Sequence, residues 1–345
     1  MSNHAQRAIL LFCLFLITCL SAHAQLRIEV TRNHHPDDDS LSDFRRALER
    51  ASEVTLAAPQ SQVPSANMGC SAGDAVEGPC PMRILIHGLG DGQQWPNGLA
   101  MISSQGISTV TDLALPPRVD AELSHDGEFV AYDSCFRPDR GIYVTELGTS
   151  QTRRVIPVDH GPACYQVRWS LDDHMLSYVN PANHALNVVA VDGSNHVSFP
   201  ATAIAGWQSW SPSGEEIVYE NGRGGSRSLQ IIDLRGKVRE LAHFGNHFGD
   251  LNSCETWAPD WSPDGTRISF VSCDRLFTVS PQGTDMQQLA SDAYSPRWSV
   301  DGQWILFLSG STLMRVRRDG QLLSRVAMLP PPYSGLSPFS LGRVR

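Results

Sequence analysis

The sequence predicts an all-β fold: a six-bladed β-propeller closed by its C-terminal strand and preceded by a short strand-helix extension. Three observations support this prediction. A short polar turn recurs six times, a series of glycines recurs with nearly the same period, and no helical pattern alternates with the strand-like segments between them. Four antiparallel strands in each period of about 40 residues are typical of a propeller blade.

The recurring turn has the form seen in "WSPDG" and "WSPSG". Proline, then aspartate or serine, and then glycine in this order favour a tight reversal between two strands. The two series recur at intervals of 37 to 51 and 37 to 47 residues, respectively. Aligned on the turn, the serines are Ser124, Ser170, Ser211, Ser262, Ser299 and Ser340, and the glycines are Gly106, Gly148, Gly193, Gly236, Gly283 and Gly320.

Within one repeat, four short strands follow each other in a fixed order. In the fifth repeat, "APDWS" is the first strand and its turn, and the alternating, β-branched "RISFVS" is the second. "LFTVSPQG" is the third strand with its turn, and the polar "DMQQLA" is the outermost strand. The same order is expected in the other repeats.

The two ends of the repeat region complement each other. Residues 82–115 resemble strands two to four of a blade without its first strand, and residues 336–345 have room for one strand only. We expect the C-terminal strand to complete the first blade, because closure removes sheet edges that would otherwise invite aggregation.

The N-terminus has the anatomy of a secretory signal over residues 1–24. Arg7 is followed by an apolar run, and small residues at Ala22 and Ala24 precede a cleavage site before Gln25. Lipidation at Cys19 is a less favoured alternative, because Thr18 replaces the usual small residue. Residues 25–81 are expected to form the extension and linker, too small for a core of their own, and residues 82–345 the propeller.

Export makes the cysteines informative. Six cysteines remain after residue 24, and an even number in an oxidising compartment suggests three disulfides, with buried free thiols as the alternative. Positions next to loops on one face of the propeller lead us to expect two pairs there and one local staple before the propeller. The expected pairs are Cys135 with Cys164, Cys254 with Cys273, and Cys70 with Cys80.

The net charge of −9 makes nucleic acid and anionic membrane surfaces unfavourable partners. After the signal, no apolar run approaches the roughly 18 residues of a transmembrane helix. We expect a monomeric protein without cofactor or metal.

The "WSPDG" turns, with "ISFVS" and "LFTVSPQG" after them, resemble the TolB-like propeller family of WD40-like repeats. The resemblance covers about residues 82–345 and implies a six-bladed periplasmic propeller that binds an envelope lipoprotein and has no catalytic residues. The family's larger N-terminal α/β domain has no counterpart of similar size in residues 25–81, which puts its assembly role in doubt.

The loops between the second and third strands, and those between blades, should share one face, which we call the top face. Arginine and aromatic residues dominate protein interfaces, and cationic groups there would receive carboxylates from a peptide. Scattered solvated charge is the competing interpretation. The candidates are Trp95, Arg137, Arg140, His184, Arg223, Arg227 and His247, whereas the recurring Trp169, Trp210, Trp261 and Trp298 are expected in the core between blades.

The favoured function is therefore a non-catalytic, exported propeller that binds a protein or peptide of the cell envelope. The alternative is a propeller lyase or hydrolase that acts on an envelope polymer through His87, His184 or His247. The His-Gly pair at His87 resembles an oxyanion-hole segment, but the sequence contains no Gly-x-Ser-x-Gly nucleophile elbow. A metal at His243, His247 and Asp250 is not expected, because the loop is glycine-rich and irregular.

Overall fold

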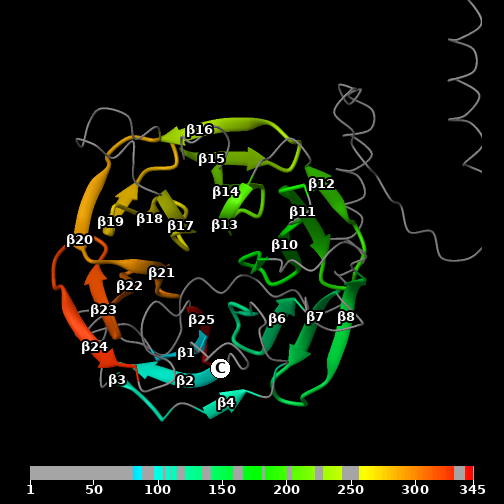
Figure 1. The fold of residues 1–345 in the computed structure, drawn as a ribbon, viewed down its shortest axis with the longest axis horizontal. Helices are drawn as coiled ribbons and strands as arrows, with labels where there is room; N and C mark the ends of the chain where they lie inside the picture. Colours follow the sequence, from blue (N-terminus) through cyan, green and yellow to red (C-terminus); the bar gives the residue numbers. More distant parts are fainter. Residues whose placement is uncertain are drawn as a thin grey trace, which may run out of the picture.

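Six antiparallel sheets surround a central axis in the computed structural model, as blades of a propeller (Figure 1). The structure describes residues 81–87, 97–103, 106–109, 111–113, 115, 121–133, 141–157, 166–180, 183–199, 204–221, 228–242, 256–329 and 339–344. No helix occurs among these residues. The expected signal and all of the expected extension except Pro81 lie outside them.

Blades 2 to 6 each contain four strands in chain order from the axis to the rim. Blade 2 contains β5(Ala121–Leu123), β6(Phe129–Asp133), β7(Gly141–Glu146) and β8(Thr152–Pro157). Blade 3 contains β9(Val167–Trp169), β10(Met175–Asn180), β11(Ala185–Ala190) and β12(Val197–Phe199). Blade 4 is β13(Ile204–Trp210), β14(Glu216–Asn221), β15(Ser228–Asp233), β16(Val238–Ala242). Blade 5 contains β17(Thr256–Trp261), β18(Ile268–Ser272), β19(Arg275–Val279) and β20(Gln287–Ser291). Blade 6 contains β21(Tyr294–Trp298), β22(Trp304–Ser309), β23(Thr312–Arg317) and β24(Ser324–Met328).

Blade 1 joins the two ends of the described chain. Its inner strand β25(Phe339–Arg343) pairs antiparallel with β1(Met82–His87), which pairs with β2(Asn97–Ser103). Outside β2 lie two short strands, β3(Gly106–Ile107) and β4(Thr111–Leu113), one at each end of β2. The single fourth strand expected from the sequence is therefore interrupted.

The serine turn explains the recurring motif. In blade 5, the hydroxyl of Ser262 donates to Asp264 at 2.7 Å and accepts the backbone N–H of Arg267 at 2.9 Å. Gly265 has φ +74°, which glycine adopts without strain. The same serine contacts recur in the turns at Ser124 and Ser170, so the motif is a hydrogen-bonded reversal between the first and second strands.

Ser340 does not belong to this series, and its alignment with the other five serines was wrong. It lies inside β25, and its hydroxyl accepts the backbone N–H of Leu123 at 2.9 Å. Ser209 and Asp260, each two residues before a turn serine, accept from the next blade in the same way. The turn-serine position in this blade is therefore occupied by Gly342. No serine turn is needed there, because β25 and β1 are not consecutive in the chain.

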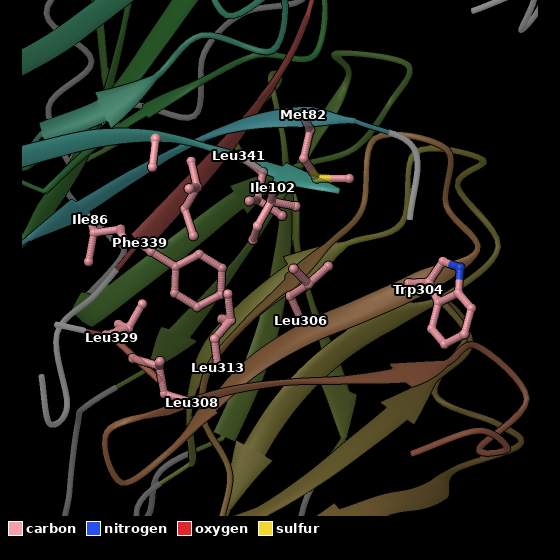
Figure 2. Packing of buried hydrophobic residues seen from close by; sticks show 12 residues of the cluster. Met82, Ile86, Ile102, Trp304, Leu306, Leu308, Leu313, Leu329, Phe339 and Leu341 are labelled. Atoms are coloured by element: carbon pink, nitrogen blue, oxygen red, sulfur yellow. The ribbon is translucent and has the colours of Figure 1, made fainter. Parts of the chain in front are cut away.

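The hydrophobic core consists of six clusters, one between each pair of neighbouring blades. Figure 2 shows the cluster between blades 6 and 1, where Phe339 and Leu341 pack near Leu306 and Leu313. Full burial of such a side chain contributes about 1.5–3 kcal/mol. The four recurring tryptophans are buried in these clusters as expected: Trp169, Trp210, Trp261 and Trp298.

Candidate functional site

One residue from the inner strand of each blade contributes to a polar ring on the axis, which we call the axial ring. Five members precede their turn serine by two residues, and Ser340 is the sixth by its equivalent hydrogen bond. Around the ring the types run acid, arginine, serine, and then acid, arginine, serine again. In order, the members are Glu122, Arg168, Ser209, Asp260, Arg297 and Ser340.

Three members hold neighbouring blades together. Ser209 Oγ accepts the N–H of Trp261 at 3.0 Å, and Asp260 Oδ2 accepts the N–H of Trp298 at 2.7 Å. Ser340 makes the third such bond, from blade 1 to blade 2. These bonds satisfy backbone donors of inner strands that have no further strand on the axial side.

The four charged members meet in the centre. Arg168 Nη1 lies 3.1 Å from Glu122 Oε2, and Arg297 Nη2 lies 4.0 Å from the same oxygen, although Arg297 is two blades away from Glu122. Arg297 Nη1 is 4.0 Å from Asp260 Oδ1. The arginine side chains are only 5% and 7% exposed, so each depends on its partners to offset the cost of desolvation.

The balance of these charges is visible in Asp260. Burial raises the pKa of this carboxyl, and the charge of Glu122 raises it further, whereas Arg297 and the Trp298 N–H act in the opposite direction. Two acids and two arginines give the ring a formal charge of zero.

Trp207 in β13 lies beside the two arginines. The guanidinium carbons of Arg168 and Arg297 are 4.7 Å and 5.9 Å from its ring centroid, which places both within cation–π range. A register shift in the pairing of β13 with β14 spans Ile204 to Gln208, where Trp207 is located. Trp207 is partly buried.

Several polar atoms of this group have no partner. Gln208 Nε2 donates to Gln166 O at 2.8 Å, but the side-chain oxygens of Gln166 and Gln208 accept nothing. Arg168 Nη1 also donates to Val167 O, while Arg168 Nε and Nη2 donate to nothing. Buried unpaired polar atoms are rare in folded proteins and indicate a water or a ligand.

The top face is where the links between blades and the second-to-third-strand turns meet. The N–H of Ala293, in the link into blade 6, donates to Asp274 O in the turn of blade 5, and Leu329 N–H donates to Ser311 O in blade 6. Each inner strand runs away from this face toward the serine turns. Trp207, two residues before Ser209, therefore lies on the top side of the axial ring.

On the opposite side of the ring, a histidine joins two serine turns. His125 Nδ1 is 3.1 Å from Asp173 Oδ1, and both oxygens of Asp173 accept backbone N–H groups of the first turn, from His125 and Asp126. Burial alone would lower the pKa of His125, but the hydrogen bond and charge of Asp173, with the charges of Glu122 and Asp260, raise it overall.

A second feature lies between blades 1 and 2. An open depression of about 420 Å³ is lined by residues of β2, the segment after β3, and the turn after β7. Arg83 and Glu128 form an ion pair of 3.7 Å at its edge. It is mainly apolar, with Leu99, Met101 and Leu147 in its wall.

Of the candidate binding residues expected on the top face, the structure describes one. His184 lies exposed in the turn between β10 and β11 with φ +56°, and its N–H donates to Asn180 O. The other candidates remain predictions because they lie outside the described residues: Trp95, Arg137, Arg140, Arg223, Arg227 and His247.

Among the cysteines, Cys273 is described and disulfide-bonded, on the top side after β18. Its expected partner lies outside the described residues, so the pairing stays a prediction. The same applies to Cys70, Cys80, Cys135, Cys164 and Cys254.

Within the described part of the chain, no group of three histidine, cysteine or acidic side chains is placed to hold a metal ion. No helix there is long and apolar enough to cross a membrane.

The fold is that of a TolB-like six-bladed propeller. The structure of TolB from Acinetobacter baumannii matches with a TM-score of 0.60 and 16% identity over 76% of this chain and 67% of that one. Putative TolB from Agrobacterium tumefaciens matches with a TM-score of 0.53 and 17% identity, over 76% and 99%.

A chain of a Nidogen/Laminin complex matches with a TM-score of 0.59 and 9% identity over 75% of this chain and 98% of that one. No family model matches the sequence, and no curated protein matches it.

The axial ring was not predicted from the sequence. A signal was present, because charged residues stand two positions before the turn serine in four repeats, where an inner strand would otherwise be apolar. Only the ring closure shows that these four side chains, between 37 and 175 residues apart, share one site.

Proposed function

We propose that the protein is an exported, periplasmic and non-catalytic propeller that binds a protein or peptide of the cell envelope on its top face. The observation that carries this proposal is the group of Trp207, Arg168 and Arg297 on the axis, with the tryptophan on the top side. Aromatic and arginine side chains contribute most to protein interfaces when they are centrally placed and desolvated.

The fold and the sequence support the same function. TolB structures share the fold, and a chain of similar shape was solved within the Nidogen/Laminin protein complex. The signal-like N-terminus supports export. The enzyme alternative has less support, because His184, the one of its three histidines whose side chain is described, lies in an exposed turn.

Cross-linking in intact cells tests the proposal. We expect wild-type protein to recover one envelope protein in a fixed ratio. Arg137→Glu combined with Arg223→Glu should abolish this recovery, since both positions are expected in top-face loops. The matched control is Arg235→Glu with Lys237→Glu, which makes the same charge change in the exposed turn between β15 and β16 on the opposite face.

Loss of the partner in the top-face variant alone supports binding on the top face. Equal loss of the cross-linked partner in both variants would mean that the change in net charge, and not the top face, is responsible. Recovery of no specific protein by the wild type would contradict the proposal.

A further inference from the structure

We propose that Arg168 is a carboxylate-binding site on the propeller axis, taking the carboxylate of a ligand that also carries an amide N–H. This inference deepens the proposed function, because a peptide partner offers both groups. In the axial group, some buried polar atoms are paired with one another and others have no partner.

Only one nitrogen of the Arg168 guanidinium, Nη1, has partners. Its Nη1 donates to Val167 O at 2.6 Å and lies 3.1 Å from Glu122 Oε2. The remaining nitrogens, Nε and Nη2, lie along one edge of the planar group and have no partner. Two parallel N–H donors on one guanidinium edge match the two oxygens of a carboxylate.

Burial makes this free edge unusual. The Arg168 side chain is 5% exposed, so water on the surface does not satisfy the edge. Leaving buried charged donors unpaired is costly, and native proteins avoid it unless a bound group compensates. Arg297, at the opposite ring position, shows the ordinary solution: its Nε and Nη1 donate to Phe339 O and Pro296 O.

The neighbouring amides add the second half of the recognition. Gln166 lies two residues before Arg168, toward the top face, and its backbone oxygen accepts Gln208 Nε2. The side-chain oxygens of both glutamines are buried acceptors without donors. Unpaired donors on Arg168 and unpaired acceptors on Gln166 and Gln208 together fit a ligand with a carboxylate and an amide N–H.

Trp207 sets the direction of approach. Its ring lies 4.7 Å from the Arg168 guanidinium carbon and on the top side of the axial ring. At that distance the ring makes a cation–π contact with the guanidinium. A ligand would arrive from the face on which the partner is proposed to bind.

The test is calorimetric titration of the full mature protein with N-acetylglycine and, as the neutral match, N-acetylglycinamide. We expect saturable binding of the acid only, with a change in tryptophan fluorescence that Trp207→Phe removes. Titration with N-acetylaspartate α-methylamide and with acetate then distinguishes the source: a chain terminus, an acidic side chain or a free acid.

Three arginine variants distinguish geometry from charge. Arg168→Lys keeps the charge but loses the two-nitrogen edge, and we expect affinity to fall about tenfold to a hundredfold, as for other charge-assisted hydrogen bonds. Arg168→Gln should abolish binding. Arg153→Gln, at an exposed arginine that donates to Val191 O, should bind like the wild type.

Equal behaviour of acid and amide up to about 10 mM, a concentration at which even weak sites fill, would overturn the inference. So would undiminished binding by folded Arg168→Lys. Because these titrations use no partner protein, failure here leaves the cross-linking result intact, and failure to find a partner leaves acid binding measurable.

Discussion

Arg168 and Arg297 hold opposite positions of the axial ring and differ in their degree of hydrogen bonding. Arg297 is held by two backbone carbonyls as well as by the acids, so its role is to connect blades. Arg168 has no partner for Nε and Nη2, so this second arginine of the axial ring is a candidate binding group. The difference arises from the neighbouring backbone and cannot be assigned from residue type.

The pair of His125 and Asp173 predicts a pH-dependent contribution to stability. The folded pKa of His125 is raised above its unfolded value of about 6.5. Its contribution is therefore fully present below that value and is lost as pH rises through the raised folded pKa. Because the side chain is 34% exposed, we expect a modest effect.

Urea unfolding of wild type and His125→Gln at a series of pH values measures this contribution. The wild type should be the more stable protein at pH 5 to 6, with the difference shrinking above. His174→Gln, at an exposed histidine in the corresponding turn of the next blade, should keep the wild-type profile. A difference between wild type and His125→Gln that grows with pH would contradict the assigned sign.

At the scale of the element, the serine turn determines where each inner strand ends. The turn in blade 5 also binds Asp264, whose carboxyl accepts from Ser262, from the Thr266 N–H and from Arg318. Burial would raise the pKa of Asp264, but these hydrogen bonds hold it well below its usual range. These side-chain bonds fix the turn together with its two backbone bonds, from Ser262 N–H to Arg267 O and from Gly265 N–H to Ser262 O.

Replacing the turn serine should destabilise the protein. In Ser262→Ala, the Arg267 N–H loses its acceptor at a fully buried position, at a cost of about 1–3 kcal/mol. Chemical denaturation followed by circular dichroism measures the loss. Ser291→Ala, at an exposed serine of β20, should change stability by less than about 0.5 kcal/mol. Equal effects of both variants would show that the hydroxyl contacts of the turn are not stabilising.

At the scale of the whole molecule, stability depends on six blade interfaces and on blade 1, in which strands from both ends of the described chain pair. The backbone of β25 reaches blade 2 directly, because Arg343 N–H donates to His125 O at 2.7 Å. A Cβ added at Gly127 would lie 2.2 Å from Arg343 O, a distance no real structure tolerates. The approach of the C-terminal strand therefore requires glycine at this position.

Two glycine variants isolate this approach. Gly127 and Gly214 occupy equivalent turn positions with φ +74° and +71°, but a Cβ at Gly214 meets nothing within 4 Å. Gly214→Ala should cost about 1–2 kcal/mol from the left-handed backbone alone. Gly127→Ala should cost clearly more, since β25 must also move. Equal free energies of unfolding for the two variants would show that the contact of β25 with blade 2 contributes nothing.

The number of blades, the order of strands within blades 2 to 6 and the burial of the four recurring tryptophans could all be predicted from the sequence. These features follow from local turn chemistry and from the alternation of apolar residues, and both patterns recur in several repeats. The alignment of Ser340 with the other turn serines was wrong because β25 is not followed by a second strand of its blade. Without that turn, the sequence after Ser340 does not show its position in the repeat.

The residues of the candidate site could not be identified without the three-dimensional structure. Glu122, Arg168, Asp260 and Arg297 are separate signals in separate repeats, and each alone reads as a polar residue in a strand. Ring closure brings each of them within 4.0 Å of at least one other, buries both arginine side chains and leaves one edge of Arg168 unpaired. Distance and desolvation across the axis are properties of the closed ring, and no local pattern encodes them.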